Sequence, residues 1–243
     1  KRARDFTTSF ALGQPGADAI GWDGTREPRL FSKATPEADL DIHLLDSEPA
    51  IAEKTPGAYR RLTVHAADMN GVLAACDNGA DAVIIGGEAW RPHRPWTLAD
   101  IRRARRLTHE YGVQLIVDTP RTTHQRECNE MEHFFRALDE INPAGLLVGN
   151  PGTMKIAKKL TCLPIQTDFS FNLFNHRAAR FLREQRTAMA TVSLELSFPQ
   201  LRSLAERSPL PLEIIVHGAT ESMICDHNLP SLALGYAHPL DDP

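Results

Sequence analysis

From Leu62 onward, short apolar segments alternate with amphipathic segments of about 10 to 15 residues. Seven apolar segments are typical of buried strands: residues 62–66, 81–87, 113–119, 144–149, 163–168, 188–194 and 212–218. Six segments between them have apolar residues at helical spacing: residues 70–79, 97–112, 127–141, 151–160, 175–185 and 197–208. Because the strands are apolar throughout and a helix separates each pair, the pattern predicts an α/β protein with a parallel sheet.

Two architectures have this alternation, the closed (β/α)8 barrel and the open doubly wound sheet. A dinucleotide fingerprint would follow the first strand of many doubly wound sheets, but "HAADMNG" stands there instead. We therefore predict a parallel (β/α) TIM-type barrel or barrel fragment over residues 61–243. Residues 1–60 are rich in Gly, Pro, Asp and Thr, and we expect an irregular N-terminal segment or linker there. An eighth strand would come from that segment or from the tail "LPSLALGY".

Polar side chains end most of the predicted strands. In either architecture the chemistry lies at the carboxyl ends of parallel strands, so these residues are expected to converge on one mouth. The candidates for substrate binding are His65, Asp118, Arg121, Asn150, Asp168 and Asn172. Arg121 follows "DTP" and would place a fixed cation over the site, which suits an anionic substrate group such as a carboxylate or phosphate.

Two further strand-end residues, Glu195 and His217, are the candidates for catalysis. Ser193 and Glu195, two residues apart on one strand, are expected to face the same side, and His217 of the next strand can reach them if these two strands are neighbours. The alternative is that Glu195 is a structural carboxylate that accepts hydrogen bonds from Arg121 or from the rim of the barrel.

Composition limits the classes of function. The net charge of −4 gives no general basic excess of the kind that nucleic-acid-binding domains often have. The basic segment "IRRARRL" fits the solvated face of an outer helix, with RNA contact as the alternative. Four cysteines lie far apart, as in a protein of the reducing cytoplasm, and no apolar run is long enough for a membrane span. The chain begins without methionine, so we expect an excerpt of a longer protein.

Several of the predicted strand ends together resemble a known family. The blocks "NGADAVIIGG", "YGVQLIVDTPR", "DFSFNLFN", "VSLELS" and "EIIVHGA" look like successive blocks of peptidase family U-32, the collagenase-like peptidases, in that family's order and spacing. The family signature has the form E-x-F-x-x-G-[SA]-[LIVM]-C-x-x-x-x-G-x-C. It matches this chain at Glu213, Gly218 and Ala219, with Ile215 in the aromatic place.

The resemblance implies a barrel-type fold and one of two chemistries. The first hypothesis is peptide hydrolysis by a collagenase-like peptidase, acting on a peptide or a small anionic substrate. The alternative is an enzyme or accessory protein that hydroxylates RNA or quinone precursors without oxygen, several relatives of this kind using an iron–sulfur cluster. A third reading is a non-catalytic barrel that serves as a binding or scaffold module.

The same signature bears on cofactors. Its two cysteine places are occupied here by Glu221 and Asn228, and thiolates are the ligands that iron–sulfur clusters require. We therefore predict no iron–sulfur cluster. His217, Cys225 and His227 with Glu221 have no known zinc-finger spacing, so no metal site is predicted either.

Overall fold

The computed structural model describes residues 60–87 and 95–219. These residues fall almost entirely within one compact unit, Glu48–His217. In the described ranges, seven strands form one sheet in chain order: β1 (Thr63–His65), β2 (Ala82–Gly86), β3 (Gln114–Asp118), β4 (Gly145–Val148), β5 (Ile165–Thr167), β6 (Met189–Thr191) and β7 (Leu212–Glu213). Every neighbouring pair is parallel, which confirms the predicted pairing of consecutive strands.

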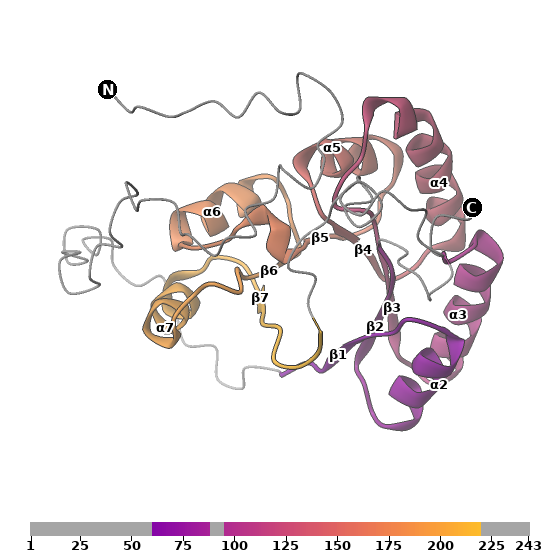
Figure 1. The fold of residues 1–243 in the computed structure, drawn as a ribbon, viewed down its shortest axis with the longest axis horizontal. Coiled ribbons are helices and arrows are strands. Elements are labelled where there is room, and N and C mark those ends of the chain that lie inside the picture. Colours follow the sequence, from indigo (N-terminus) through magenta and orange to yellow (C-terminus); the bar gives the residue numbers. More distant parts are fainter. Residues whose placement is uncertain (1–59, 88–94, 220–243) are drawn as a thin grey trace, which may run out of the picture. The chain divides into compact units, whose positions relative to one another are not determined.

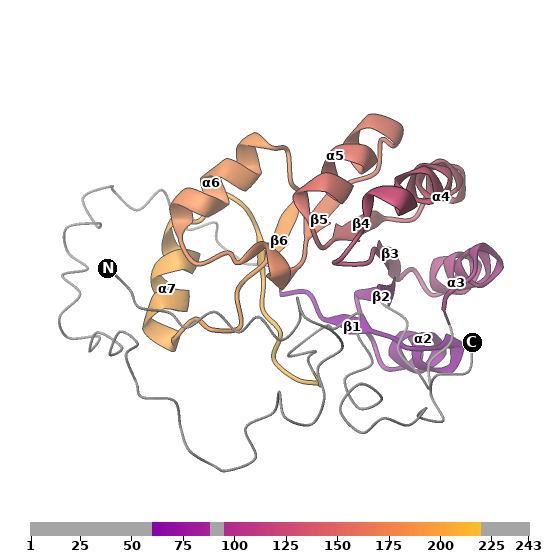
Figure 2. The same ribbon diagram turned by 45° about the horizontal axis from the view of Figure 1, so that its top comes forward.

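Six helices connect the strands within these described ranges. They are α2 (Met69–Asp77), α3 (Leu98–Glu110), α4 (Cys128–Ile141), α5 (Pro151–Leu160), α6 (His176–Glu184) and α7 (Phe198–Arg207). Two short 3-10 turns, η4 (Gln125–Glu127) and η5 (Phe169–Phe171), follow β3 and β5. The strands curl into a half-barrel, and Figures 1 and 2 show the helices around its outer side. The predicted fold class is therefore confirmed as a barrel fragment with parallel strands.

Alternation along the strands explains the two sides of the sheet. Val83, Val117 and Val148 belong to the main apolar core, together with helix residues such as Phe135 and Leu138, so this side faces the helices. Their neighbours in sequence face the other, concave side. Ala82, Ile84, Ile116 and Leu147 form a separate buried cluster to which no helix residue belongs.

The helices begin where the sequence provides caps. Asn150 accepts a hydrogen bond from the Thr153 amide at 2.8 Å at the start of α5, and Thr97 and Asp100 form a capping box at the start of α3. Because Asn150 comes two residues after the end of β4, its cap also fixes the strand-end loop there. No helix in the described part of the chain is long and apolar enough to cross a membrane.

Strand β7 is shorter than predicted. The apolar run to Val216 predicts a strand as far as residue 218, but β7 ends at Glu213, which pairs with Thr191. Val216 is 84% exposed, so the second half of the run has no sheet neighbour or core to pack against among the described residues. The physical reason is that β6 ends at Thr191, so within residues 60–87 and 95–219 no strand lies beside the residues after Glu213.

Candidate functional site

The mouth of the half-barrel is lined by inward-facing residues at the carboxyl ends of the strands. Asp118 is the last residue of β3, and Asp168 follows β5 directly; both are buried. His65 ends β1 and is exposed, with its Nε2 4.0 Å from the Asp118 Oδ2. The structure therefore brings His65 and Asp118 together, as the sequence predicts for residues on one mouth.

Two glycines at the end of β2 allow this approach. Gly86 and Gly87 have positive φ values of 106° and 80°. A β-carbon on Gly86 would lie 2.5 Å from the Asp118 carbonyl oxygen, and one on Gly87 would lie 2.7 Å from the carboxylate Oδ2. The Gly87 amide also donates to the Asp118 carbonyl oxygen at 3.1 Å. Glycine is thus required here on two counts, conformation and space.

Arg121 is held in the loop after β3 by groups from the next two strand ends. Its Nε lies 3.0 Å from the Asp168 Oδ2, and its guanidinium carbon lies 4.5 Å from the centre of the Phe169 ring. The Asn150 side-chain amide donates to the Arg121 carbonyl oxygen at 3.0 Å. Gly149 makes room, because a β-carbon there would lie 2.6 Å from the Arg121 Cα. The guanidinium is mostly buried against Asp168, so its positive charge is largely balanced by the Asp168 carboxylate.

The other predicted site residues are less enclosed. Asn150 is the cap of α5, and Asn172 is exposed, in the left-handed conformation that ends η5. Glu195 and His217 are both exposed. The expectation that Ser193 and Glu195 share one strand is wrong, because β6 ends at Thr191 and Glu195 lies in a turn. The Ser193 hydroxyl instead accepts a hydrogen bond from the Glu195 amide at 3.3 Å.

A polar row on the concave side includes residues that the strand ends in the sequence do not indicate. Thr167 pairs with Ala190, so the next residues, Asp168 and Thr191, lie side by side, and Thr191 pairs with Glu213. The buried Thr191 hydroxyl donates to the Glu213 Oε2 at 3.1 Å. Within residues 60–87 and 95–219, the Glu213 Oε1 has no hydrogen-bond partner. A two-residue alternation along β6 and β7, followed inward from the strand ends, is the signal that would have found this row.

Gln166 extends the polar surface to a level below the mouth. It lies two residues before Asp168 on β5 and is 7% exposed. Its Oε1 also has no hydrogen-bond partner among the described residues. Buried polar atoms of this kind usually have a partner, so the Gln166 and Glu213 oxygens mark two places on the concave side where a hydrogen-bond donor is expected. Apart from Asp118 at the end of β3, the concave side is therefore apolar on β2–β4 and polar on β5–β7.

Cysteines and metal ligands do not gather in the described residues. Cys76 is buried in α2, Cys128 begins α4, and Cys162 lies between α5 and β5. Burial, followed by the charge of Asp77, raises the pKa of the Cys76 thiol, so it stays a protonated, apolar side chain. Within this part of the chain, no three His, Cys, Asp or Glu side chains could hold a metal ion, so these residues do not fit an iron–sulfur cluster. Glu221, Cys225, His227 and Asn228 lie outside the described residues, so the prediction for them is not tested.

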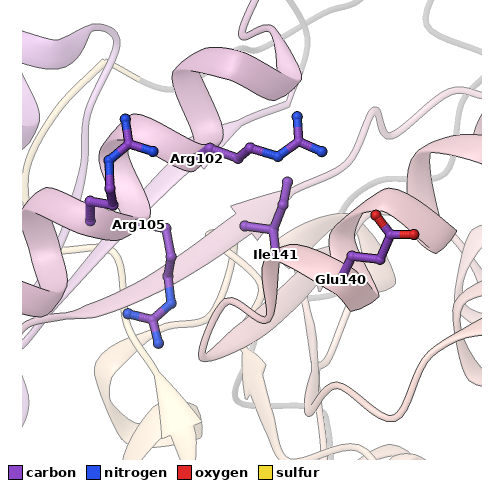
Figure 3. A pocket seen from close by; sticks show the side chains of 5 residues that line it. Arg102, Arg105, Glu140 and Ile141 are labelled. Carbon is purple, nitrogen blue, oxygen red and sulfur yellow. The ribbon is translucent and has the colours of Figure 1, made fainter.

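The arginine-rich helix α3 lies on the outer surface, as predicted. Figure 3 shows Arg102 and Arg105 of α3 beside Glu140 and Ile141 of α4, around a shallow pocket of about 360 Å³. The Arg105 Nε donates to the Asn142 carbonyl oxygen at 3.0 Å. Together α3 and α4 carry five Arg and six Asp or Glu residues, so their combined net charge is −1. This surface has no basic excess.

The fold and the mouth define a class of protein: a parallel (β/α) half-barrel with buried carboxylates, a buried ion pair and, on its concave side, buried acceptor atoms that have no partner among the described residues. The model of the family described as peptidase family U32 matches residues 67–237, and this chain belongs to that family. A solved structure of the family, the U32 peptidase Mk0906, has the same fold, with a TM-score of 0.54 and 13% identity over 69% of this chain and 72% of that one.

Two characterised relatives are similar in sequence. The tRNA hydroxylation protein P1 of Bacillus subtilis (strain 168) is 25% identical over 162 residues, which cover 65% of this chain and 38% of that protein. The 23S rRNA 5-hydroxycytidine C2501 synthase of Escherichia coli (strain K12) is 23% identical over 144 residues, 58% of this chain and 22% of that protein. The chain thus spans well under half of the length of either relative.

Proposed function

We propose that this chain takes part in the hydroxylation of RNA, and that the mouth of the half-barrel holds the nucleotide to be modified. The observation that carries the proposal is the similarity to two proteins, one named for the hydroxylation of tRNA and one for the synthesis of a hydroxylated cytidine in rRNA. This places the RNA alternative ahead of peptide hydrolysis, which rests on the name of the family.

The concave polar surface supports the proposal. A nucleobase presents ring nitrogens and exocyclic groups that donate and accept hydrogen bonds along its edge. Glu213 and Gln166 carry acceptor atoms that have no partner among the described residues, and Gln166 pairs in register with Leu147 of the buried apolar cluster. These side chains bind, orient and move protons. Hydroxylation also removes two electrons and adds an oxygen atom, so a redox cofactor or separate oxidant with an oxygen donor completes the reaction.

Peptide hydrolysis receives less support from the geometry. The expected arrangement needs His217 within hydrogen-bond reach of Ser193 or Glu195. Among the described residues no hydrogen bond joins them, and the Ser193 hydroxyl is engaged by the Glu195 amide. The roles of Glu195 and His217 in catalysis stay a prediction.

The test is the nucleoside content of cellular RNA. Disruption of the gene in its host is expected to remove from tRNA or rRNA a nucleoside that is heavier than its precursor by one oxygen atom, read by mass spectrometry of digested RNA. Reintroduction of the wild-type gene should restore it. An unchanged set of nucleosides, together with cleavage of denatured collagen by the purified full chain, would instead support the peptidase hypothesis.

Replacement of Glu213 by glutamine tests the polar row directly. The amide oxygen can still accept the hydrogen bond from Thr191, but the negative charge is lost. We expect the yield of the hydroxylated nucleoside to fall about tenfold or more, with the free energy of unfolding within about 1 kcal/mol of wild type. The matched control is Glu206→Gln, which removes an exposed carboxylate paired with Arg202 on α7. Equal yields from both variants would remove Glu213 from the site.

A further inference from the structure

The outer helix layer opens between α5 and α6. The core under α2 to α5 and the core under α6 and α7 are separate apolar clusters, and Phe171 packs against both. A groove of about 570 Å³ lies at this junction. Its apolar lining includes Met154, Phe171, Leu173 and Phe181, and its cations are Lys155 and Lys158.

The groove begins beside the mouth. Pro151 lines it and is the first residue of α5, directly after Asn150. Phe171 also lines it and ends η5, which starts at Phe169 beneath the Arg121 guanidinium. Lys158 lies two helical turns beyond Pro151, roughly 10 Å along α5. The groove thus leads from the mouth along the outer surface between α5 and α6, which are neighbours in Figures 1 and 2.

The two helices that form the groove carry a local basic excess. Helices α5 and α6 contain six Lys or Arg residues and one acidic residue, Glu184, a net charge of +5 in a chain whose net charge is −4. No Asp or Glu is among the residues that line the groove. Burial, followed by repulsion from Arg186, lowers the pKa of Lys158. A bound anion relieves this repulsion, so the groove is electrostatically complementary to a negative ligand.

The lining is also aromatic. Phe181 is 57% exposed at the edge of the groove, while Leu173 and Met154 are buried. An exposed aromatic ring beside lysines is the combination that binds single-stranded nucleic acid, since bases stack on the ring and phosphates contact the cations. A folded RNA duplex exposes its phosphates but not its base faces, so it would contact the lysines without stacking a base on Phe181.

We propose that the α5–α6 groove binds a single-stranded segment of RNA, with phosphates on Lys155 and Lys158 and a base stacked on Phe181. The bound strand leads a nucleotide into the adjacent mouth. This inference rests on the proposed function, in that RNA is the substrate, and adds the surface that holds it. The arginine-rich surface of α3 is not the site, because the acidic residues of α4 balance its charge.

The experiment measures binding of a short fluorescein-labelled single-stranded RNA to the full chain by fluorescence anisotropy, over a series of salt concentrations. In the double variant Lys155→Ala/Lys158→Ala we expect about tenfold weaker binding. The negative slope of log K against log salt should become smaller in magnitude by about 1.4, which is about 0.7 per phosphate contact. Phe181→Ala is expected to weaken binding at least about fivefold and leave the slope unchanged, because stacking releases no counterions.

The matched control is Arg102→Ala/Arg106→Ala, which removes two charges from the outer surface of α3. It should bind the RNA as wild type does. Equal weakening by this control and by the lysine variant would mean general charge attraction and would overturn the proposal, as would the absence of binding to wild type. Self-association of wild type that the groove variants abolish, or preferential binding of an acidic peptide, would also overturn it.

Failure of this inference can be told apart from failure of the proposed function. If the gene disruption leaves RNA nucleosides unchanged but the groove variants still lose RNA binding, the groove stands and hydroxylation fails. If the disruption removes a hydroxylated nucleoside but the groove variants bind RNA normally, hydroxylation stands and the groove fails.

Discussion

Replacement of Gly86 by alanine is expected to lower the free energy of unfolding by about 3 to 5 kcal/mol. Two costs combine: a side chain at a φ of 106° is strained, and its β-carbon would lie 2.5 Å from the carbonyl oxygen of Asp118. The neighbouring atom belongs to the backbone of a central strand, so it cannot move aside without disturbing the pairing of β2 and β3. Urea denaturation followed by circular dichroism measures the loss.

The control for Gly86 is Gly79→Ala. Gly79 also has a positive φ, 80°, but a β-carbon there would meet no atom within 4 Å. We expect a loss of only about 1 to 2 kcal/mol, from backbone strain alone. The difference between the two variants isolates the close approach of β2 to Asp118. Similar losses in both variants would show that the Asp118 backbone leaves room for a β-carbon at position 86.

Replacement of Arg121 by alanine is expected to cost about 3 to 4 kcal/mol of stability. The Asp168 carboxylate is 9% exposed, so removing its partner leaves a negative charge buried without its ion pair. Arg202→Ala is the control, because its pair with Glu206 is highly exposed and should contribute less than about 0.5 kcal/mol. The double variant Arg121→Met/Asp168→Leu, which removes both charges, should regain most of the loss. Denaturant midpoints measure all four proteins.

A different result for Arg121→Ala would support the prediction, made from sequence, that Arg121 binds an anionic group. If the variant is as stable as wild type but loses affinity for RNA or another anionic ligand, the guanidinium is an open anion receptor. Three observations favour a structural role for Arg121: its ion pair with Asp168, its stacking on Phe169 and the close approach of Gly149 to its backbone.

The sequence was sufficient for the order of elements because each strand is apolar and each helix is amphipathic. Strands β1 to β6 fall within the predicted segments, and the parallel order follows from the helix between each pair. The strand-end rule also located Asp118, Asp168 and His65, because a parallel sheet brings all of its carboxyl ends to one edge. The division into residues 1–60 and 61–243 falls partly outside the described residues and stays a prediction.

The strand-end rule gives wrong residues for the mouth where the true end of a strand differs from the predicted one. Side chains alternate between the two sides of a sheet, so an error of one or two residues in a strand end changes which residues face the mouth. The pattern predicts Glu195 on a strand, but β6 ends at Thr191. Glu213, four residues before His217, matches the family signature, and only its pairing with Thr191 shows that it is an inward-facing carboxylate. A strand ends where its pairing with the neighbouring strand stops, and the sequence of the strand itself does not determine that point.

The unbroken order of strands from β1 to β7 has a kinetic consequence. Each strand pairs with the one that follows it in the chain, so every step of sheet growth closes a loop of only one helix and its connections. Mean sequence separation between contacting segments is therefore low for a parallel sheet, a topology that otherwise folds slowly. The half-barrel can add one βα unit at a time as the chain leaves the ribosome, starting from Thr63, before the polar row of β5 to β7 is synthesised.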